Sequence, residues 1–362
     1  MQNTLHTPQD LGLIGSTIVW LRERFFSSIG NSILTILSVW LLLIAIPALF
    51  DWGFTRASFL ADNAQECRAA GGACWAFIGE KYRFILFGTY PYEQQWRPFL
   101  AVALFILMLI ASTWRRLWNI KLLFVWGFGL ASSAILMWGG IFGLTYVENT
   151  NWGGLPITLL LATFANILAF PLGVLLALGR RSKMPAIKSM CVVYIELIRG
   201  VPLISLLFMA SLMLPLFLPE GITIDKLLRA LIAMALFSAA YVAETVRGGL
   251  QAIPKGQIEG AESLGLGYWQ QMRLIILPQA LKIVIPPLVG IFIALFKDTS
   301  LVVVVGIFDL TLAAKTSLVD PKWQGFSIEV YIFISLIYFI FCFSMSKYSQ
   351  ALEKRLAVGQ KR

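Results

Sequence analysis

The chain has 362 residues, of which 58% are hydrophobic and 13% are charged, and its mean hydropathy is +0.78. A run of about 20 apolar residues spans a bilayer, and the chain holds several such runs, which excludes a soluble domain. The net charge of +10 does not indicate nucleic-acid binding, because the basic residues stand beside apolar runs and not in one patch. This placement is typical of residues that anchor a protein at the cytoplasmic face of a membrane.

Taken in chain order, the apolar runs predict about eight transmembrane helices and therefore an all-α integral membrane protein. These helices are expected at residues 29–50, 98–114, 122–144, 155–179, 187–218, 227–246, 277–296 and 328–345. The fifth is interrupted at Gly200-Val201-Pro202. The apolar residues 301–308 are too few to span, which suggests a half-helix or a re-entrant piece.

The distribution of charge predicts the topology. Basic clusters around Arg115, Arg180 and Arg355 fall on one side of an eight-helix arrangement. Because basic residues are enriched in cytoplasmic loops, we expect both termini in the cytoplasm. Residues 51–97 and the acidic loop 145–154 are then expected outside.

A division of the chain is expected near residue 150. Residues 1–150 would form an accessory region with three transmembrane helices and the external segment 51–97. Residues 155–349 would form a core of five transmembrane helices, with a polar loop at 252–278. Residues 350–362 would form a basic cytoplasmic tail.

The four cysteines offer one candidate disulfide. Cys67 and Cys74 share the predicted external segment, where disulfides form and persist. Their spacing does not settle the geometry, so a disulfide and two free thiols both remain open. The sequence holds a single histidine and no cluster of metal ligands, so no metal site is predicted.

The loop at residues 252–278 has the features of a short helix that ends at a defined residue. Pro254 suits the first helical position, where its missing N–H costs nothing. Gly265 can adopt the left-handed conformation that closes a helix, and Leu266 can fold back on the last turn. A second helix is expected to begin near Tyr268. An ordinary interfacial loop is the alternative interpretation.

The spacing in this loop resembles the EAA loop of ABC-importer permeases, E-A-A-x3-G-x9-I-x-L-P. The matching residues are Glu259-Gly260-Ala261, Gly265 and Ile275-x-Leu277-Pro278. Gly260 replaces an alanine of the family pattern, which costs about 1 kcal/mol of helix propensity. In that family the helix docks in a groove of the ATPase subunit, so the resemblance implies an ATPase-coupling role for six residues. They are Glu259, Gly260, Ala261, Gly265, Leu266 and Gly267.

Three further motifs resemble the polar amino acid permeases, the histidine/glutamine branch of the ABC importers. They are the segments 194–203, 243–249 and 297–301. The match from Trp152 to Asp309, with three extra N-terminal helices, is similar to the M-type subunit of general L-amino-acid permeases. The resemblance implies a five-helix type-1 ABC permease core in the bacterial inner membrane. It also implies four kinds of partner: a homologous Q-type permease, two ATPase subunits that bind ATP and Mg, an external solute-binding protein and an L-amino acid.

One pair of charged residues falls within the fifth predicted transmembrane helix, and a second pair lies at the cytoplasmic end of the sixth. Glu196 and Arg199 are three residues apart and share a helix face, as do Glu244 and Arg247. Ionisable residues inside a membrane pair with one another or line a substrate path. Glu244 and Arg247 are interpreted as a structural ion pair. For Glu196 and Arg199 an ion pair and a place on the substrate path are both kept.

The segment from Lys297 to Ser300 is the better candidate for contact with the solute. Asp298, Thr299 and Ser300 all suit an N-cap, so a new helix could start here after a break. A helix start beside Lys297 would favour the carboxylate of an amino acid, and Asp298 would accept its ammonium group. The alternative is that Lys297 and Asp298 pair with each other or across a permease dimer.

The chain contains no G-x-x-x-x-G-K-[ST] phosphate loop, so we expect ATP hydrolysis in partner subunits and no catalytic residue or cofactor in this chain. An ion-coupled secondary transporter is the first rival, but it predicts paired repeats and acidic residues at the bilayer midplane. An integral membrane enzyme is the second. The sequence offers no nucleophile beside a base for it.

Overall fold

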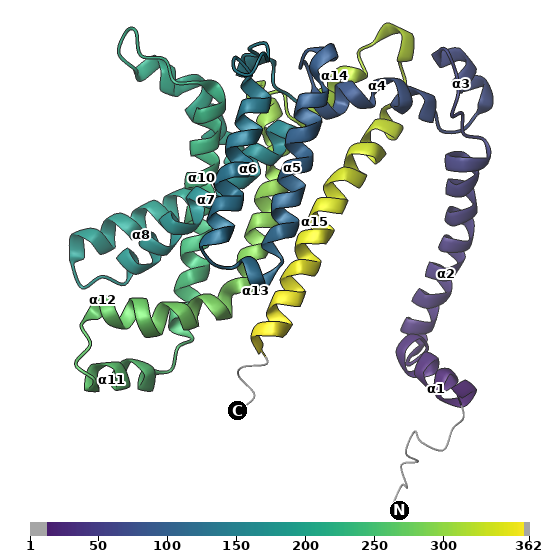
Figure 1. Ribbon diagram of the computed structural model, residues 1–362. Coiled ribbons are helices and arrows are strands. Elements are labelled where there is room, and N and C mark those ends of the chain that lie inside the picture. Colours follow the sequence, from purple (N-terminus) through teal and green to yellow (C-terminus); the bar gives the residue numbers. More distant parts are fainter. Residues whose placement is uncertain (1–12, 358–362) are drawn as a thin grey trace, which may run out of the picture. The chain divides into compact units, whose positions relative to one another are not determined.

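A computed structural model of the protein describes residues 13–357. The chain divides into two compact units between Gly79 and Glu80, inside helix α4 (Trp75–Phe87). The elements of each unit are labelled in Figure 1.

The first unit is built on one apolar helix. It contains α1 (Leu13–Phe25), α2 (Ile29–Phe50), the π-helical turn η2 (Asp51–Thr55) and α3 (Ala64–Ala70). No residue of α2 is buried within the described part of the chain. A helix that is apolar on all sides is typical of a membrane span, and α2 has the bounds predicted from the sequence.

The polar segment after α2 is folded. Asn63 caps α3 by accepting hydrogen bonds from the backbone N–H groups of Gln65 and Glu66, both at 3.0 Å. Cys67 and Cys74 are joined in a disulfide that links α3 to the residues before α4. From the sequence alone, a disulfide and two free thiols were both possible for this pair.

The second unit consists of helices joined by short connections. Its longer helices are α5 (Trp96–Ser112), α6 (Ile120–Trp138), α7 (Leu155–Arg180), α8 (Pro185–Gly200), α10 (Lys226–Gln251), α13 (Leu277–Asp298) and α15 (Ser327–Ala357). Its shorter helices are α9 (Leu203–Phe208), α11 (Lys255–Ser263), α12 (Tyr268–Gln271) and α14 (Leu310–Ser317).

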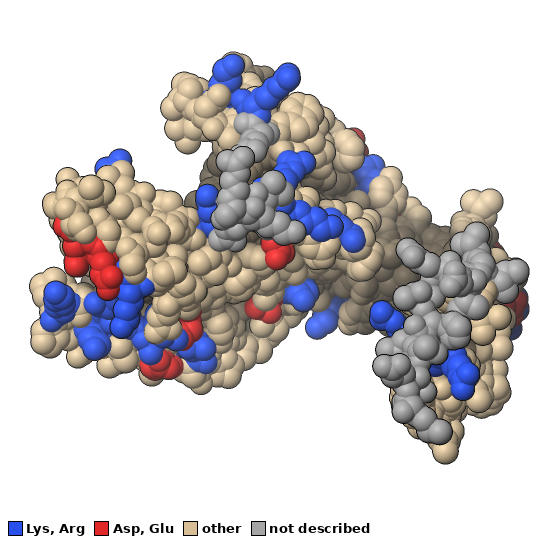
Figure 2. All heavy atoms as spheres, turned by 90° about the horizontal axis from the view of Figure 1, so that it is seen from below, with Lys and Arg blue, Asp and Glu red and all other residues tan. Residues whose placement is uncertain are grey.

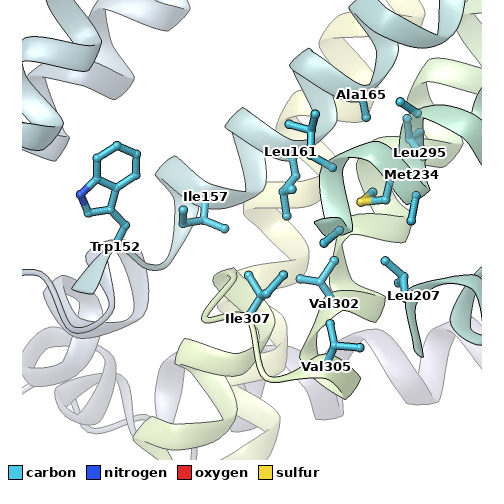
Figure 3. Packing of buried hydrophobic residues seen from close by; sticks show 14 of the residues in the cluster. Trp152, Ile157, Leu161, Ala165, Leu207, Met234, Leu295, Val302, Val305 and Ile307 are labelled. Carbon is cyan, nitrogen blue, oxygen red and sulfur yellow. The ribbon is translucent and has the colours of Figure 1, made fainter. Parts of the chain in front are cut away.

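Helices α7, α10 and α13 form the centre of the second unit. Gly173 of α7 allows a close approach to α10, because a Cβ at this position would lie 2.5 Å from Cγ1 of Val242. Small residues at helix contacts are typical of membrane helix pairs. The buried apolar side chains shown in Figure 3 include Leu161 of α7, Met234 of α10 and Leu295 of α13.

The fold confirms an all-α membrane protein. Seven helices in the described residues are long and apolar enough to span a membrane. An eighth candidate is the bent pair Pro185–Gly200 and Leu203–Phe217, whose two parts meet at 104°. The predicted fifth span is therefore not a straight helix, because Pro202 interrupts the hydrogen-bond ladder after Gly200.

Two features of the structure concern the predicted division of the chain. Residues 350–357 of the predicted tail continue α15, and residues 358–362 lie outside the described part. The division near residue 150 is not a boundary between compact units. Helices α5 and α6 share a buried apolar cluster with α7, to which Ala101 and Met137 belong.

Helix α4 is also tied to the connection that precedes α15. Lys81 pairs with Asp320 at 2.6 Å, and Nε1 of Trp323 donates to Glu80 at 2.9 Å. The Lys81 ammonium group holds the pKa of Asp320 below its usual value. These contacts join the predicted accessory region to the predicted core.

Candidate functional site

The EAA-like loop (residues 252–278) begins with a short helix at one end of the second unit. Helix α11 starts at Lys255, directly after Pro254. The structure thus places the proline one position earlier than predicted, at the N-cap, where its extended backbone directs the chain into the helix (φ −57°, ψ 139°).

The end of α11 has the geometry that the sequence predicted. Gly265 has φ +70°. Its N–H donates to the carbonyl of Glu262 at 2.9 Å, and the N–H of Leu266 donates to the carbonyl of Ala261 at 3.2 Å. These two bonds form a Schellman motif. Because a side chain at Gly265 would strain the left-handed backbone, this glycine fixes the direction of the chain as it leaves α11.

The second helix of the loop continues into the membrane-spanning helix. The N–H of Gly267 donates to Oε1 of Gln270 at 3.0 Å, and α12 begins at Tyr268, as predicted. A π-helical turn, η8 (Met272–Ile276), then joins α12 to α13. Pro278 has no N–H to donate to the preceding turn. The π-helical turn η8 lies just before this proline.

The exposed side chains of the loop differ from those that the motif alone singled out. Ala261 is buried and so packs inward. The most exposed large apolar side chains of the loop are Leu264, which is 75% exposed, and Trp269, which is 70% exposed; Tyr268 and Leu274 are exposed as well. Sequence reasoning singled out neither Leu264 nor Trp269. Exposed aromatic and aliphatic side chains of this kind are typical of protein-binding surfaces.

A cluster of five charged side chains lies where α7, α8 and α10 meet; we call Arg180, Glu196, Arg199, Glu244 and Arg247 the charge cluster. Glu244 is its centre. Nη1 of Arg180 lies 3.3 Å and Nη1 of Arg199 lies 3.8 Å from Oε2 of Glu244. Nε of Arg247 donates to Glu244 at 3.0 Å, which is the structural ion pair that the sequence predicted.

The partner of Glu196 was not predicted. Its Oε1 accepts from Nη1 of Arg180 at 2.8 Å, whereas Arg199 turns to Glu244. Arg180 entered the sequence analysis only as a marker of topology. The charge cluster thus sets three guanidinium groups against two carboxylates and links three helices. Figure 2, which views the molecule from below, shows acidic and basic side chains gathered on the side where Figure 1 places α8, α11 and α12.

The predicted helix start at Asp298 is wrong. Helix α13 passes directly into the 3-10 helix η9 (Thr299–Val305), and Asp298 has helical backbone angles without a side-chain cap. The hydroxyl of Thr299 donates backward to the carbonyl of Phe296 at 2.7 Å. A threonine hydroxyl can donate to a backbone carbonyl of the preceding turn. The residues that were predicted to be an N-cap therefore continue the preceding helix.

The helix start in this part of the chain is Asp309. Its carboxylate accepts from the N–H groups of Thr311 at 3.0 Å and Leu312 at 2.9 Å, and so caps α14. Asp309 is fully buried, and burial raises its pKa to about 6. The aspartate directly before Leu310 was the signal for this cap.

Comparison with known proteins assigns the chain to a family. Residues 169–358 match the family of binding-protein-dependent transport system inner membrane components. This match covers more than half of the chain, and the chain therefore belongs to that family. It is an ABC transporter permease.

Individual relatives are similar over almost the whole chain. The inner membrane amino-acid ABC transporter permease protein YhdY of Escherichia coli (strain K12) is 50% identical over 353 residues, covering 95% of this chain and 94% of that protein. The glutamate/glutamine/aspartate/asparagine transport system permease protein BztC of Rhodobacter capsulatus is 40% identical over 424 residues, covering 96% and 95%.

A solved structure matches a smaller part. The crystal structure of an amino acid ABC transporter with histidines is 37% identical with a TM-score of 0.50, and the match covers 56% of this chain and 92% of that one. The rest of this chain lies outside the match.

Proposed function

We propose that this chain is the permease subunit of an ATP-driven importer of L-amino acids. The observation that carries the proposal is the EAA-like loop, whose predicted closing turn is present and whose exposed Leu264 and Trp269 offer a binding surface. The names of the two similar permeases, both described as amino acid transporters, support the class of solute. An ion-coupled mechanism has no support from the relatives.

We propose that the EAA-like loop and both termini lie in the cytoplasm. Basic side chains are enriched on the cytoplasmic side of membrane proteins. Arg180 and Arg181 end α7 and Arg247 lies in the last part of α10, so these residues share the end of the second unit that carries the loop. The N-terminal end of α7 and the segment 51–97 would then face the exterior.

The proposed partners rest on two observations: the sequence has no phosphate loop, and the family is named for its dependence on a binding protein. The sequence has no phosphate loop, so two ATPase subunits would bind ATP and Mg and dock on the loop. A family of binding-protein-dependent transporters implies an external solute-binding protein. We further propose that the second permease is a homologous Q-type subunit, as in the M-type family that the sequence resembles.

The loop would transmit force through shape. Binding of ATP would draw the two ATPase subunits together and move α11 with them. Helix α12 continues through η8 into α13 without a break, so a displacement of the loop would reach the membrane-spanning helix directly. The acidic residues Glu259 and Glu262 are exposed and need no catalytic role.

Lys297 and Asp298 remain our candidates for the solute path. The reason is no longer the helix start that was first expected but their position inside a membrane span. They lie in the last turn of α13, inside the span Tyr268–Val305. Ionisable residues at such positions commonly mark substrate pathways. Thr299 is buried and bonded to its own helix, so it is a weaker candidate than Ser300. We place Glu196 and Arg199 in the charge cluster and not on the path.

Affinity purification of the tagged chain from its host membrane, followed by intact-mass measurement, tests the composition. We expect one copy of this chain, one homologous permease and two ATPase subunits. Uptake of labelled amino acids into proteoliposomes should require ATP and the binding protein. Uptake that continues without ATP and collapses with the ion gradient would contradict the proposal.

A further inference from the structure

A half-enclosed cavity of about 160 Å³ lies between α5, α6 and the beginning of α7. Its walls are almost wholly apolar. The residues that matter here are Phe105 of α5, Ala134 and Trp138 of α6, and Leu160 and Phe164 of α7. The cavity therefore separates the added helices from the core helix that they cover.

The cavity lies at membrane depth. Along α7 its wall extends from Pro156 to Phe164, eight residue steps and therefore about 12 Å of helix. This is less than half of the roughly 30 Å hydrocarbon core. The cavity thus reaches from the interface at the N-terminal end of α7 into the apolar layer, where the molecules that could fill it are protein or lipid.

Two side chains that line the cavity, Trp152 and Ser133, each carry a buried polar atom without a hydrogen-bond partner among the described residues. These atoms are Nε1 of Trp152 and Oγ of Ser133. Trp152 is only 4% exposed, and Figure 3 shows its indole to one side of the other labelled side chains, just before α7. Buried donors without an acceptor are rare in folded proteins, so a bound molecule that brings an acceptor would satisfy this N–H.

We propose that the cavity binds one acyl chain of a membrane phospholipid, whose ester carbonyl accepts a hydrogen bond from Nε1 of Trp152. Tryptophan favours the membrane interface because its ring is apolar and its N–H is a donor. Apolar cavities of about 150 Å³ stay dry and take apolar ligands. An amino acid zwitterion does not fit, because the walls offer no charged partner.

The proposed lipid joins α5 and α6 to the core helix α7. It fills the space that these three helices leave and so extends the buried apolar contact between the added region and the core. This inference concerns the architecture of the membrane-spanning part and does not depend on which solute is transported.

Native mass spectrometry tests the proposal. The full-length protein, in its purified transporter, is reconstituted in nanodiscs of dioleoyl phosphatidylethanolamine and dioleoyl phosphatidylglycerol and then released. We expect this chain to retain one phospholipid. Ala134→Phe, which fills the cavity, should lose it. Ala131→Phe is the matched control, because Ala131 is exposed on the same helix and does not line the cavity.

A second variant tests the polar contact without filling the space. Trp152→Phe keeps an aromatic wall and removes the donor, so lipid retention should weaken about fivefold, the usual effect of one neutral hydrogen bond. Equal retention by Ala134→Phe and Ala131→Phe would overturn the proposal. So would a wild-type chain without bound lipid, the result expected if protein side chains fill the cavity.

Discussion

The EAA-like loop and the charge cluster lie at the same end of the second unit, but they are built in opposite ways. The loop is held by bonds between residues close in sequence, such as the N–H of Leu266 to the carbonyl of Ala261. The charge cluster is held by residues from three helices, with Arg180 and Glu244 separated by 64 positions. The loop exposes apolar side chains that can bind another protein. In the charge cluster, by contrast, the charged groups pair with one another. The comparison indicates that the loop is a rigid attachment point for another protein and that the charge cluster beside it braces the helices through ion pairs.

Replacement of Gly265 should have the largest effect. In Gly265→Val the left-handed backbone would cost about 2 kcal/mol, roughly a 30-fold smaller population of the closed turn. ATP hydrolysis by the assembled transporter should then proceed with little uptake. Parallel assays of phosphate release and of uptake in proteoliposomes measure this uncoupling. Normal coupled transport in this variant would count strongly against the docking role.

Removal of the central charge should have an intermediate effect on stability. Glu244→Gln leaves three arginines without their shared carboxylate. Loss of one partner of a buried pair costs about 3–5 kcal/mol, but Glu244 is 23% exposed and solvent screens it. We therefore expect a loss of about 1–2 kcal/mol, measured as a lower midpoint of thermal unfolding in detergent.

The matched control for the cluster is Glu262→Gln, which neutralises an exposed carboxylate on α11. Its unfolding midpoint should stay at the wild-type value, because isolated surface charges contribute little. If the two variants unfold at the same temperature, the charge cluster does not brace the helices.

The smallest effect is expected at Gly260, which lies within α11. A Cβ at Gly260 would meet no atom within 4 Å, and the residue is helical. Gly260→Ala should thus stabilise the helix by up to about 1 kcal/mol and leave coupled uptake unchanged. Slower amide hydrogen exchange in α11 is the measurement. Unchanged or faster exchange would show that helix propensity does not limit the order of this loop.

The same contrast explains how much the sequence could predict. Apolar runs gave the number and order of the spans, because each run is a local property. Gly265 and Tyr268 were placed correctly for the same reason. The partner of Glu196 could not be predicted, because Arg180 reaches it only after two helices have packed. The cap at Asp298 failed because Asp, Thr and Ser suit helix starts and also bond backward in a helix that continues; Asp309 fulfils that role instead.

The link between α4 and the approach to α15 has a consequence for any shortened version of this protein. A gene product beginning at residue 151 would lack the carboxylate that accepts from Trp323 and the ammonium group that pairs with Asp320. It would also present the bare side of α7 to lipid. Helix α4 and the apolar cluster of α5 and α6 with α7 are thus structural parts of the second unit, and a version shortened to the predicted core would lose contacts that hold that unit together.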